Sequence, residues 1–307
     1  MILELNRSQN ELYTIAVIIP TYNRKELLKK AILSVLNQSF KSKEIIVVDD
    51  CSNFNTKEYL DKFFSKEILT GLIKVIVNNK NFGAAKSRNI GIKNSRSNYI
   101  AFLDSDDCWH LDKLKKQIKK FEENRKLDLV YCDQYVIKDG VKNKSGIKMI
   151  NKNILNYLIN FWLPTSPSAL LFKKKSLEDV GCFDEEIGRS ASDHYLWFRM
   201  AIKKFNVDFV DEPLCYYYTE NQDRNSLNLN NRMTSIKVLL RKVQKHISKE
   251  KFLLFESLYI GTVCSFIFKE EMKNKNYFKM IQVYFKFLIF NKYFYKTAIR
   301  NLLKIRS

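Results

Sequence analysis

The sequence predicts an α/β fold in which a mostly parallel sheet is flanked by helices and followed by a helical C-terminal region. Two observations support this prediction. Short apolar runs alternate with amphipathic stretches through the first two thirds of the chain, a pattern typical of parallel sheets with helices on both faces. From Arg232 onward the sequence consists of helical segments rich in Phe, Tyr, Ile and Lys. We therefore divide the chain into residues 1–225, a sheet-bearing α/β unit, and 226–307, a basic, aromatic-rich helical region.

The first part of the chain alternates predicted strands with predicted helices. Its opening apolar run ends at Pro20 and is typical of a buried strand. The helix that follows carries apolar residues in a repeating i, i+1, i+4, i+5 stripe, which one buried helical face requires. The predicted strands are 16–19, 44–48, 73–77 and 99–103, and the predicted helices are 25–38, 56–64, 85–94 and a segment around 111–121.

The later part of the predicted sheet is less regular in sequence. A strand is predicted over 128–132, and Asp139-Gly140 indicates a turn to a partner strand. Residues 142–186 show no clear period. A helix is predicted over 192–205 with Ser192 as its N-cap. Two further strands are predicted, over 207–210 and 214–218.

The composition indicates a globular protein with an uneven basic charge. The 307 residues carry a formal charge of +20, and 231–307 supplies +13 of it, from 17 Lys and Arg against four Glu. Such a surface attracts nucleic acid, anionic lipid or other polyanions, and charge alone does not choose between them. The six cysteines form no CxxC pair, and with no signal peptide at the N-terminus we expect a cytoplasmic protein with reduced thiols. The apolar segment 252–268 is short for a membrane span.

Polar clusters follow several predicted strands directly. They are Thr21-Tyr22-Asn23, Asp49-Asp50 and Asp104-Ser105-Asp106-Asp107. Ligands of open α/β sheets bind at the carboxyl ends of the strands, so these clusters are expected to gather along one rim. The sequence therefore predicts a ligand site there before any family is considered.

The acidic cluster places three carboxylates within the four residues Asp104 to Asp107. This density is costly unless a cation balances it, and Mg²⁺ or Mn²⁺ bound to oxygen ligands commonly bridges a carboxylate to substrate phosphates. Such a cation also neutralises a diphosphate leaving group. The alternative is a solvated turn in which Asp107 caps the next helix.

Six motifs in order resemble the inverting family 2 glycosyltransferases of the GT-A fold. The resemblance covers residues 17–218. The motifs are VIIPTYN from Val17, IIVVDDCS from Ile45, NFGAAKSRNIGI from Asn81, FLDSDD from Phe102, GCFDE from Gly181 and SDHYLW from Ser192.

The resemblance implies a role for each matching residue. A nucleotide-sugar site would comprise Pro20, Thr21, Tyr22, Asp50, Arg88, Asp104, Ser105 and Asp106. Within it, Asp104 and Asp106 match the DxD motif and would hold Mn²⁺ or Mg²⁺ on the diphosphate. Asp193 matches the catalytic base that deprotonates the acceptor hydroxyl.

The position of Asp193 agrees with that role on physical grounds. It lies in the first turn of a predicted helix, where the helix dipole favours the ionised carboxylate that a general base needs. The alternative is that Asp193 only stabilises the helix end. The family often has an acid before this base, whereas this chain has Ser192. The roles of two other residues are left open. Trp197 would either stack on an acceptor sugar or belong to the core, and Arg224 would close over the diphosphate as a lid.

The resemblance implies an inverting transfer of a sugar from a nucleotide diphosphate, with UDP the expected carrier, to a hydroxyl of a glycan. The acceptors that the resemblance implies include lipid-linked glycans, as in bacterial surface polysaccharide synthesis. No QxxRW motif follows Asp193, so we expect single additions. The basic C-terminal helices either contact the inner face of the membrane peripherally or form an ordinary helical subdomain.

Two other classes of protein would share some of these features. A nucleic-acid-binding protein would account for the charge, but no nucleic-acid motif is present and an acidic rim repels phosphate, so no nucleic-acid partner is expected. A nucleotidyltransferase would account for the acids, but it leaves Asp193 unexplained and lacks a Gly-rich phosphate loop here.

Overall fold

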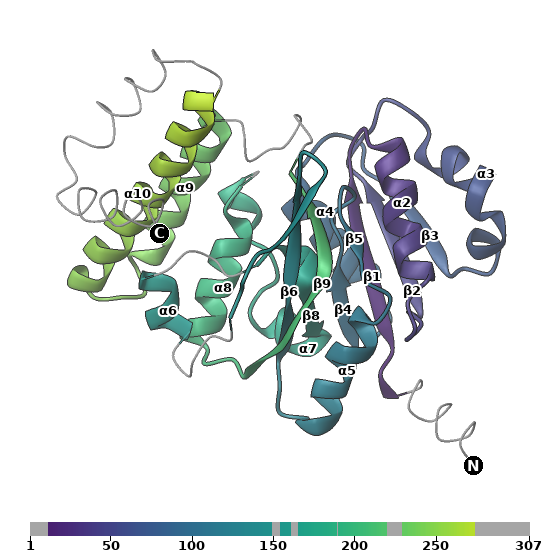
Figure 1. Cartoon of the computed structure of the whole chain (residues 1–307), viewed down its shortest axis with the longest axis horizontal. Coiled ribbons are helices and arrows are strands. Elements are labelled where there is room, and N and C mark those ends of the chain that lie inside the picture. The colour runs from purple at the N-terminus through teal and green to yellow at the C-terminus, as the bar shows by residue number, and fades with distance from the viewer. Residues whose placement is uncertain (1–11, 149–153, 161–164, 189, 220–228, 274–307) are drawn as a thin grey trace.

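The computed structural model of the 307-residue chain describes residues 12–148, 154–160, 165–188, 190–219 and 229–273 (Figure 1). Its centre is a nine-stranded sheet with the order β3-β2-β1-β4-β8-β6-β9-β5, and β7 pairs with β6. The strands are β1 (Ile15–Thr21), β2 (Glu44–Asp49), β3 (Ile73–Val77), β4 (Tyr99–Phe102), β5 (Cys108–Trp109), β6 (Leu129–Lys138), β7 (Val141–Lys144), β8 (Leu170–Lys173) and β9 (Val207–Tyr218).

The sheet confirms the predicted α/β fold. Strands β3, β2, β1 and β4 are parallel neighbours, and β6 pairs with β9 in parallel, whereas β8, β5 and β7 join through antiparallel pairs. The parallel half is the part whose strands and helices alternate in the sequence. Its carboxyl ends therefore lie along one edge, which is where the predicted rim belongs.

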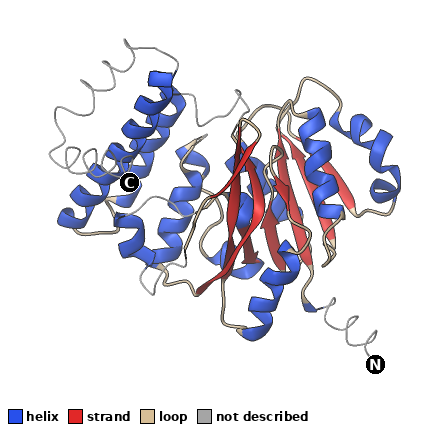
Figure 2. Ribbon diagram, in the orientation of Figure 1, coloured by secondary structure: helices blue, strands red, loops and turns tan. Residues whose placement is uncertain are grey.

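Helices cover both faces of the sheet (Figure 2). Alternate residues of β1 show why: Ile15, Val17 and Ile19 face one apolar core, while Ala16 and Ile18 face the other. Helices α2, α3 and α5 close the first core, and α4, α6, α7, α8, α9 and α10 contribute to the second. The helices are α2 (Lys25–Leu36), α3 (Thr56–Leu69), α4 (Ala84–Asn94), α5 (Lys113–Glu123), α6 (Ile154–Asn160), α7 (Lys174–Asp179), α8 (Ser192–Ile202), α9 (Leu229–Val243) and α10 (Lys249–Lys273), with short 3-10 helices η1 (Pro167–Ala169) and η2 (Glu185–Ile187).

Three details differ from the predictions. The two strands expected over 207–218 are one strand, β9, whose register with β6 shifts around Asp133, opposite Pro213. Proline has no N–H to donate to the ladder, so it is tolerated at such an irregularity. Strand β8, which lies between β4 and β6, was not predicted because residues 142–186 show no clear sequence period. The N-cap of α8 is Ala191, at φ 74°, and not Ser192, which is the first helical residue.

The described C-terminal helices pack on the sheet-bearing part of the chain. Leu239 and Val243 of α9 and Phe255 of α10 belong to the same core as Leu196 of α8. Figure 1 shows α9 and α10 beside α8, at the end of the molecule opposite α3. Across the residues described here, no helix has both the length and the apolar character needed to cross a membrane. Most of the basic tail, residues 274–307, and Arg224 lie outside the described residues.

Candidate active site

The polar clusters predicted at the strand ends do meet along one edge of the sheet. Thr21 ends β1, Asp49 ends β2 opposite it in the parallel register, and Asp104 comes two residues after β4. The backbone N–H of Asp50 donates to the carbonyl of Thr21 at 2.8 Å, which fixes the two neighbouring strand ends together. Pro20 and Thr21 are buried, whereas Tyr22 is 46% exposed and faces solvent at this edge.

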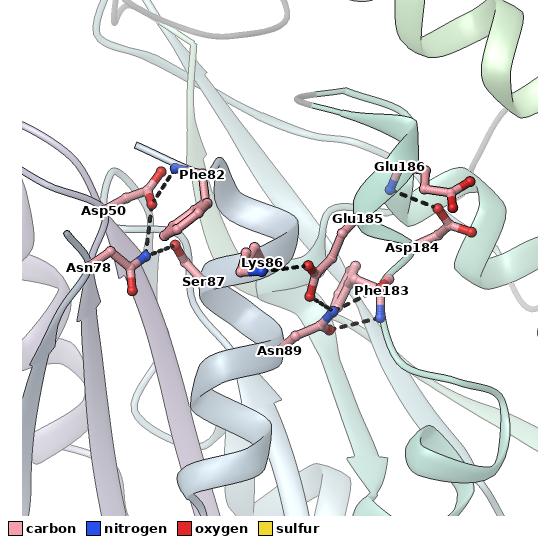
Figure 3. A network of polar contacts seen from close by, with 10 residues as sticks. All are labelled: Asp50, Asn78, Phe82, Lys86, Ser87, Asn89, Phe183, Asp184, Glu185 and Glu186. Atoms are coloured by element: carbon pink, nitrogen blue, oxygen red, sulfur yellow. Dashed lines mark hydrogen bonds and ion pairs between the residues drawn. The ribbon is translucent and has the colours of Figure 1, made fainter. Parts of the chain in front are cut away.

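Asp50 holds the loop that leads into α4 (Figure 3). One carboxylate oxygen accepts from Asn78 Nδ2 at 2.8 Å and from the N–H of Phe82 at 2.9 Å, and the other accepts from the N–H of Gly83 at 2.7 Å. Gly83 has φ 96°, a conformation that side chains disfavour, and it is the N-cap of α4. Asp50 thus has a structural task at this rim in addition to its predicted place in the nucleotide-sugar site.

The acidic turn after β4 is organised by Ser168, a buried residue of η1. Its hydroxyl donates to Asp107 Oδ2 at 2.6 Å and accepts from the N–H of Asp104 at 3.0 Å. Asp107 is 1% exposed, so its carboxylate faces the protein interior and not solvent. The other two acids, Asp104 and Asp106, are only partly buried, and Ser105 between them is 6% exposed. The expectation that Asp107 caps the next helix is not met, because α5 starts after Asp112.

An arginine pairs with each of the two partly buried acids, Asp104 and Asp106. Arg88 of α4 donates from its Nη2 to Asp104 Oδ1 at 2.5 Å, and Arg24 donates from its Nη1 to Asp106 Oδ2 at 3.1 Å. The side chain of Arg88 is 7% exposed and its guanidinium lies 5.2 Å from the ring centroid of Phe183. Two buried polar atoms at the same rim, Thr21 Oγ1 and Arg88 Nε, have no hydrogen-bond partner among the described residues. Buried polar atoms are usually satisfied, so these two can form hydrogen bonds to a ligand or to water at this rim.

Helix α4 is fixed from two sides, and this positions Arg88 (Figure 3). On one side Ser87 contacts Asn78. On the other, the Asn89 amide donates to the carbonyl of Phe183 and accepts from the N–H of the same residue, at 2.9 and 3.0 Å. Lys86 adds an ion pair to Glu185 at 3.1 Å. The GCFDE motif therefore fixes α4 and leads into the segment that carries Asp193.

Asp193 lies in the first turn of α8 with an ionised carboxylate. Burial alone raises its pKa, but the charge and hydrogen bonds of His194 and the charge of Arg88 outweigh that effect and lower the pKa to about 2. The Nδ1 atom of His194 is 3.2 Å from Asp193 Oδ1. The ring of His194 in turn packs edge-on against Tyr259 of α10, at 5.4 Å between centroids. Thus a described C-terminal helix reaches the residue next to the predicted base.

Trp197 is a core residue. It is fully buried and packs edge-on against Tyr131 at 5.7 Å, so it is not available to stack on an acceptor sugar. Sequence reasoning also missed two residues of the site. Arg24 directly follows Thr21-Tyr22-Asn23, and its place in the sequence next to a predicted rim cluster was the available signal. Ser168 had no such signal, because it lies in the aperiodic segment 142–186.

These features define a GT-A-like sheet whose rim is lined by paired acids and arginines, and comparisons with known proteins agree with this fold and show the family. Residues 16–181 match the family described as Glycosyl transferase family 2. The "Uncharacterized glycosyltransferase MJ1057" of Methanocaldococcus jannaschii is 33% identical over 214 residues, which cover 68% of this chain and 72% of that protein. The chain therefore belongs to glycosyl transferase family 2 and is a glycosyltransferase.

Two further comparisons concern proteins with more specific names. The "UDP-Glc:alpha-D-GlcNAc-diphosphoundecaprenol beta-1,3-glucosyltransferase WfaP" of Escherichia coli is 38% identical over 127 residues, covering 41% of this chain and 48% of that protein. The crystal structure of S. aureus TarS 1-349 in complex with UDP-GlcNAc is similar in fold, with a TM-score of 0.66 and 19% identity, over 89% of this chain and 80% of that one. The first of these is matched over less than half of its length.

Proposed function

We propose that the chain is an inverting glycosyltransferase that takes a sugar from UDP and transfers it to a hydroxyl of a glycan, with Asp193 as the base. One observation carries this proposal. Arg88 pairs with Asp104 on the donor side, and its charge also lowers the pKa of Asp193. A diphosphate and a base must flank the anomeric carbon in such a reaction, and Arg88, which pairs with Asp104, is also near enough to Asp193 for its charge to act there.

The donor site would comprise the residues at the rim. Thr21 Oγ1 and Arg88 Nε supply unused polar atoms, Tyr22 supplies an exposed ring, and Pro20, Asp50 and Ser105 shape the floor. Asp104 and Asp106 would hold Mn²⁺ or Mg²⁺. No group of three His, Cys, Asp or Glu side chains is arranged to hold a metal within the described ranges. Two carboxylates nevertheless fit a hard divalent cation that takes its other oxygen ligands from the donor phosphates. When bound, it neutralises charge on the departing diphosphate.

Asp193 would take the proton from the acceptor hydroxyl. Its depressed pKa keeps the carboxylate ionised at neutral pH, which is the form a base requires. The Nδ1 atom of His194 lies 3.2 Å from Asp193 Oδ1 and limits how the carboxylate can turn. The hydroxyl would attack from the side opposite the diphosphate, so the anomeric configuration inverts.

The acceptor class is inferred from the relatives. WfaP is named for transfer to a diphosphoundecaprenol-linked sugar, and another relative, AmsB of Erwinia amylovora, is named for amylovoran biosynthesis. We propose that this chain likewise adds single sugars in surface polysaccharide synthesis, on a glycan that is lipid-linked. A peripheral contact with the inner face of the membrane through the basic region 226–307, in the cytoplasm, would bring the enzyme to such an acceptor.

The test is an Asp193→Asn variant assayed with UDP-sugars and Mn²⁺. We expect UDP with Mn²⁺ to raise the unfolding temperature of the variant as it does that of the unaltered protein, while UDP release in the presence of acceptor falls by about 10²- to 10⁴-fold. Asp179→Asn, at the end of α7 and away from the rim, is the matched control and should retain activity. Turnover of Asp193→Asn within about threefold of the unaltered protein would remove Asp193 as the base. If no nucleoside diphosphate stabilises the unaltered protein with any metal, the donor proposal is wrong.

A further inference from the structure

Arg24 forms an ion pair with Asp106, one of the two acids that would hold the metal bound with the donor. Its Nη1 atom is 3.1 Å from Asp106 Oδ2, and the two side chains are 16% and 15% exposed. The residues are 82 positions apart in sequence, so the fold itself brings them together. Arg24 lies directly after the matched motif, which ends at Asn23.

The backbone of Arg24 is held firmly at the rim. Asn23 before it has φ 53°, and its N–H donates to Ser52 Oγ at 2.8 Å. The Asn23 side chain accepts from the N–H of Asn53, also at 2.8 Å. Helix α2 starts directly after Arg24, and the Leu28 N–H donates to the Arg24 carbonyl at 2.9 Å. A change of partner by Arg24 therefore needs rotation of its side chain only, and the guanidinium end is not fully buried.

Two of the three carboxylates at the acidic turn are already paired with arginines. The third, Asp107, is bonded inside the protein to Ser168, while Asp104 and Asp106 face the guanidinium groups of Arg88 and Arg24. A divalent cation added alone would place two further positive charges beside these guanidinium groups in a partly desolvated site. A diphosphate added alone would add negative charge to a turn that already holds three carboxylates. The two added together bring almost no net charge, and uncompensated charge in such a site is costly.

We propose that Arg24 is a further donor-site residue that couples metal binding to donor binding. Arg24 holds Asp106 while the site lacks donor, and so opposes binding of the metal by itself. When donor and metal arrive together, Arg24 releases Asp106 to the metal and turns its guanidinium to the diphosphate, whose oxygens it can bind through two N–H groups. This inference rests on the proposed donor site at Asp104 and Asp106.

The test measures Mn²⁺ affinity without nucleotide and UDP affinity at saturating Mn²⁺, by calorimetry, for the unaltered protein and Arg24→Gln. We expect Arg24→Gln to bind Mn²⁺ alone about tenfold more tightly and UDP with Mn²⁺ about tenfold more weakly, so that the coupling between the two ligands falls. Lys25→Gln is the matched control. It removes the same charge one residue later, where the ammonium lies 4.7 Å from the ring centroid of Phe54, and it should change neither affinity.

Arg24→Lys serves if the glutamine variant does not fold. Lysine keeps the charge that opposes Mn²⁺ but loses the two-pronged contact, so Mn²⁺ affinity without nucleotide should stay unchanged while UDP affinity falls. The proposal is overturned if Arg24→Gln binds Mn²⁺ alone no more tightly than the unaltered protein, or if its UDP affinity is unchanged. An unaltered protein that binds neither UDP nor Mn²⁺ would instead refute the proposed donor site.

Discussion

Replacing Arg88 by Met tests whether one side chain joins the two halves of the site. Met has a similar length and keeps an apolar contact with the ring of Phe183, but it leaves Asp104 without its partner and removes a charge that lowers the pKa of Asp193. The expected effects are a less stable protein, weaker donor binding and a higher pKa for Asp193.

The magnitude follows from the burial of the pair. Removing one partner of a fully buried ion pair costs about 3–5 kcal/mol. Arg88 is nearly inaccessible, but the Asp104 side chain is 26% exposed and water can reach it, so we discount the cost to about 2 kcal/mol. For a chain of this size that lowers Tm by about 4–8 °C. Loss of a charge-assisted contact to phosphate, at about 1.5–3 kcal/mol, weakens UDP binding by about 10- to 100-fold.

Thermal unfolding with and without UDP and Mn²⁺ measures both effects. Lys93→Met removes a positive charge from the exposed face of the same helix and is the matched control, with Tm and the UDP-dependent shift unchanged. The Tm and the UDP-dependent shift of Arg88→Lys should fall between those of Arg88→Met and Lys93→Met. A Tm of Arg88→Met within about 1 °C of the unaltered protein, together with a full UDP-dependent shift, would refute the reasoning that Arg88 is a buried link between Asp104 and the donor.

Two further predictions concern stability. A Cβ atom at Gly91 of α4 would lie 2.4 Å from Ile18 Cγ2 on the buried face of β1, so Gly91→Ala should destabilise the protein by about 1–3 kcal/mol in chemical denaturation, although alanine favours helices; Lys93→Ala, on the exposed face, should not. Burial lowers the pKa of Lys113 to about 8, with weaker opposing effects from Cys132 and Cys215. The unfolded chain then binds more protons at this lysine between about pH 8 and pH 10.5, so its contribution to stability rises with pH across that window. The free energy of unfolding of the unaltered protein relative to Lys113→Met should therefore increase between these pH values. A constant or falling difference would show that the pKa of Lys113 is not lowered in the folded protein.

The parallel half of the fold was predictable because its signals are local. Each strand there is a short apolar run, and each helix carries its own stripe, so strand 73–77 was predicted with the bounds that β3 has. The rim followed from the rule that ligands bind at the carboxyl ends of such strands. Strand β8 was not predictable in this way. It is four residues long, and its burial depends on β4 and β6, which lie on either side of it but are remote in sequence.

The pairing of the acids with arginines could not be predicted from the sequence either. The sequence indicated that three carboxylates in four residues need a balancing charge, and a metal was the expected source. The structure supplies two arginines, one from α4 and one from the N-cap of α2, and Asp107 turns inward to Ser168. Which cation meets which acid depends on side-chain reach across strands that are separated by tens of residues. No local pattern encodes that distance.

The same arginines explain how one rim can serve two opposite electrostatic needs. Departure of a diphosphate requires positive charge, whereas a base must stay negative within reach of it. Burial by itself would protonate Asp193 more easily, and a carboxylate that picks up a proton cannot accept one from the acceptor. His194 and Arg88 reverse that tendency. Because α4 is fixed both to Asp50 through Asn78 and to the GCFDE motif through Asn89, the charge that balances Asp104 is held at a constant position relative to the segment that bears Asp193. The proposed donor side and the proposed acceptor side are therefore built around one helix, which is a physical reason for Ser87, Arg88 and Asn89 to lie on α4 and not on a free loop.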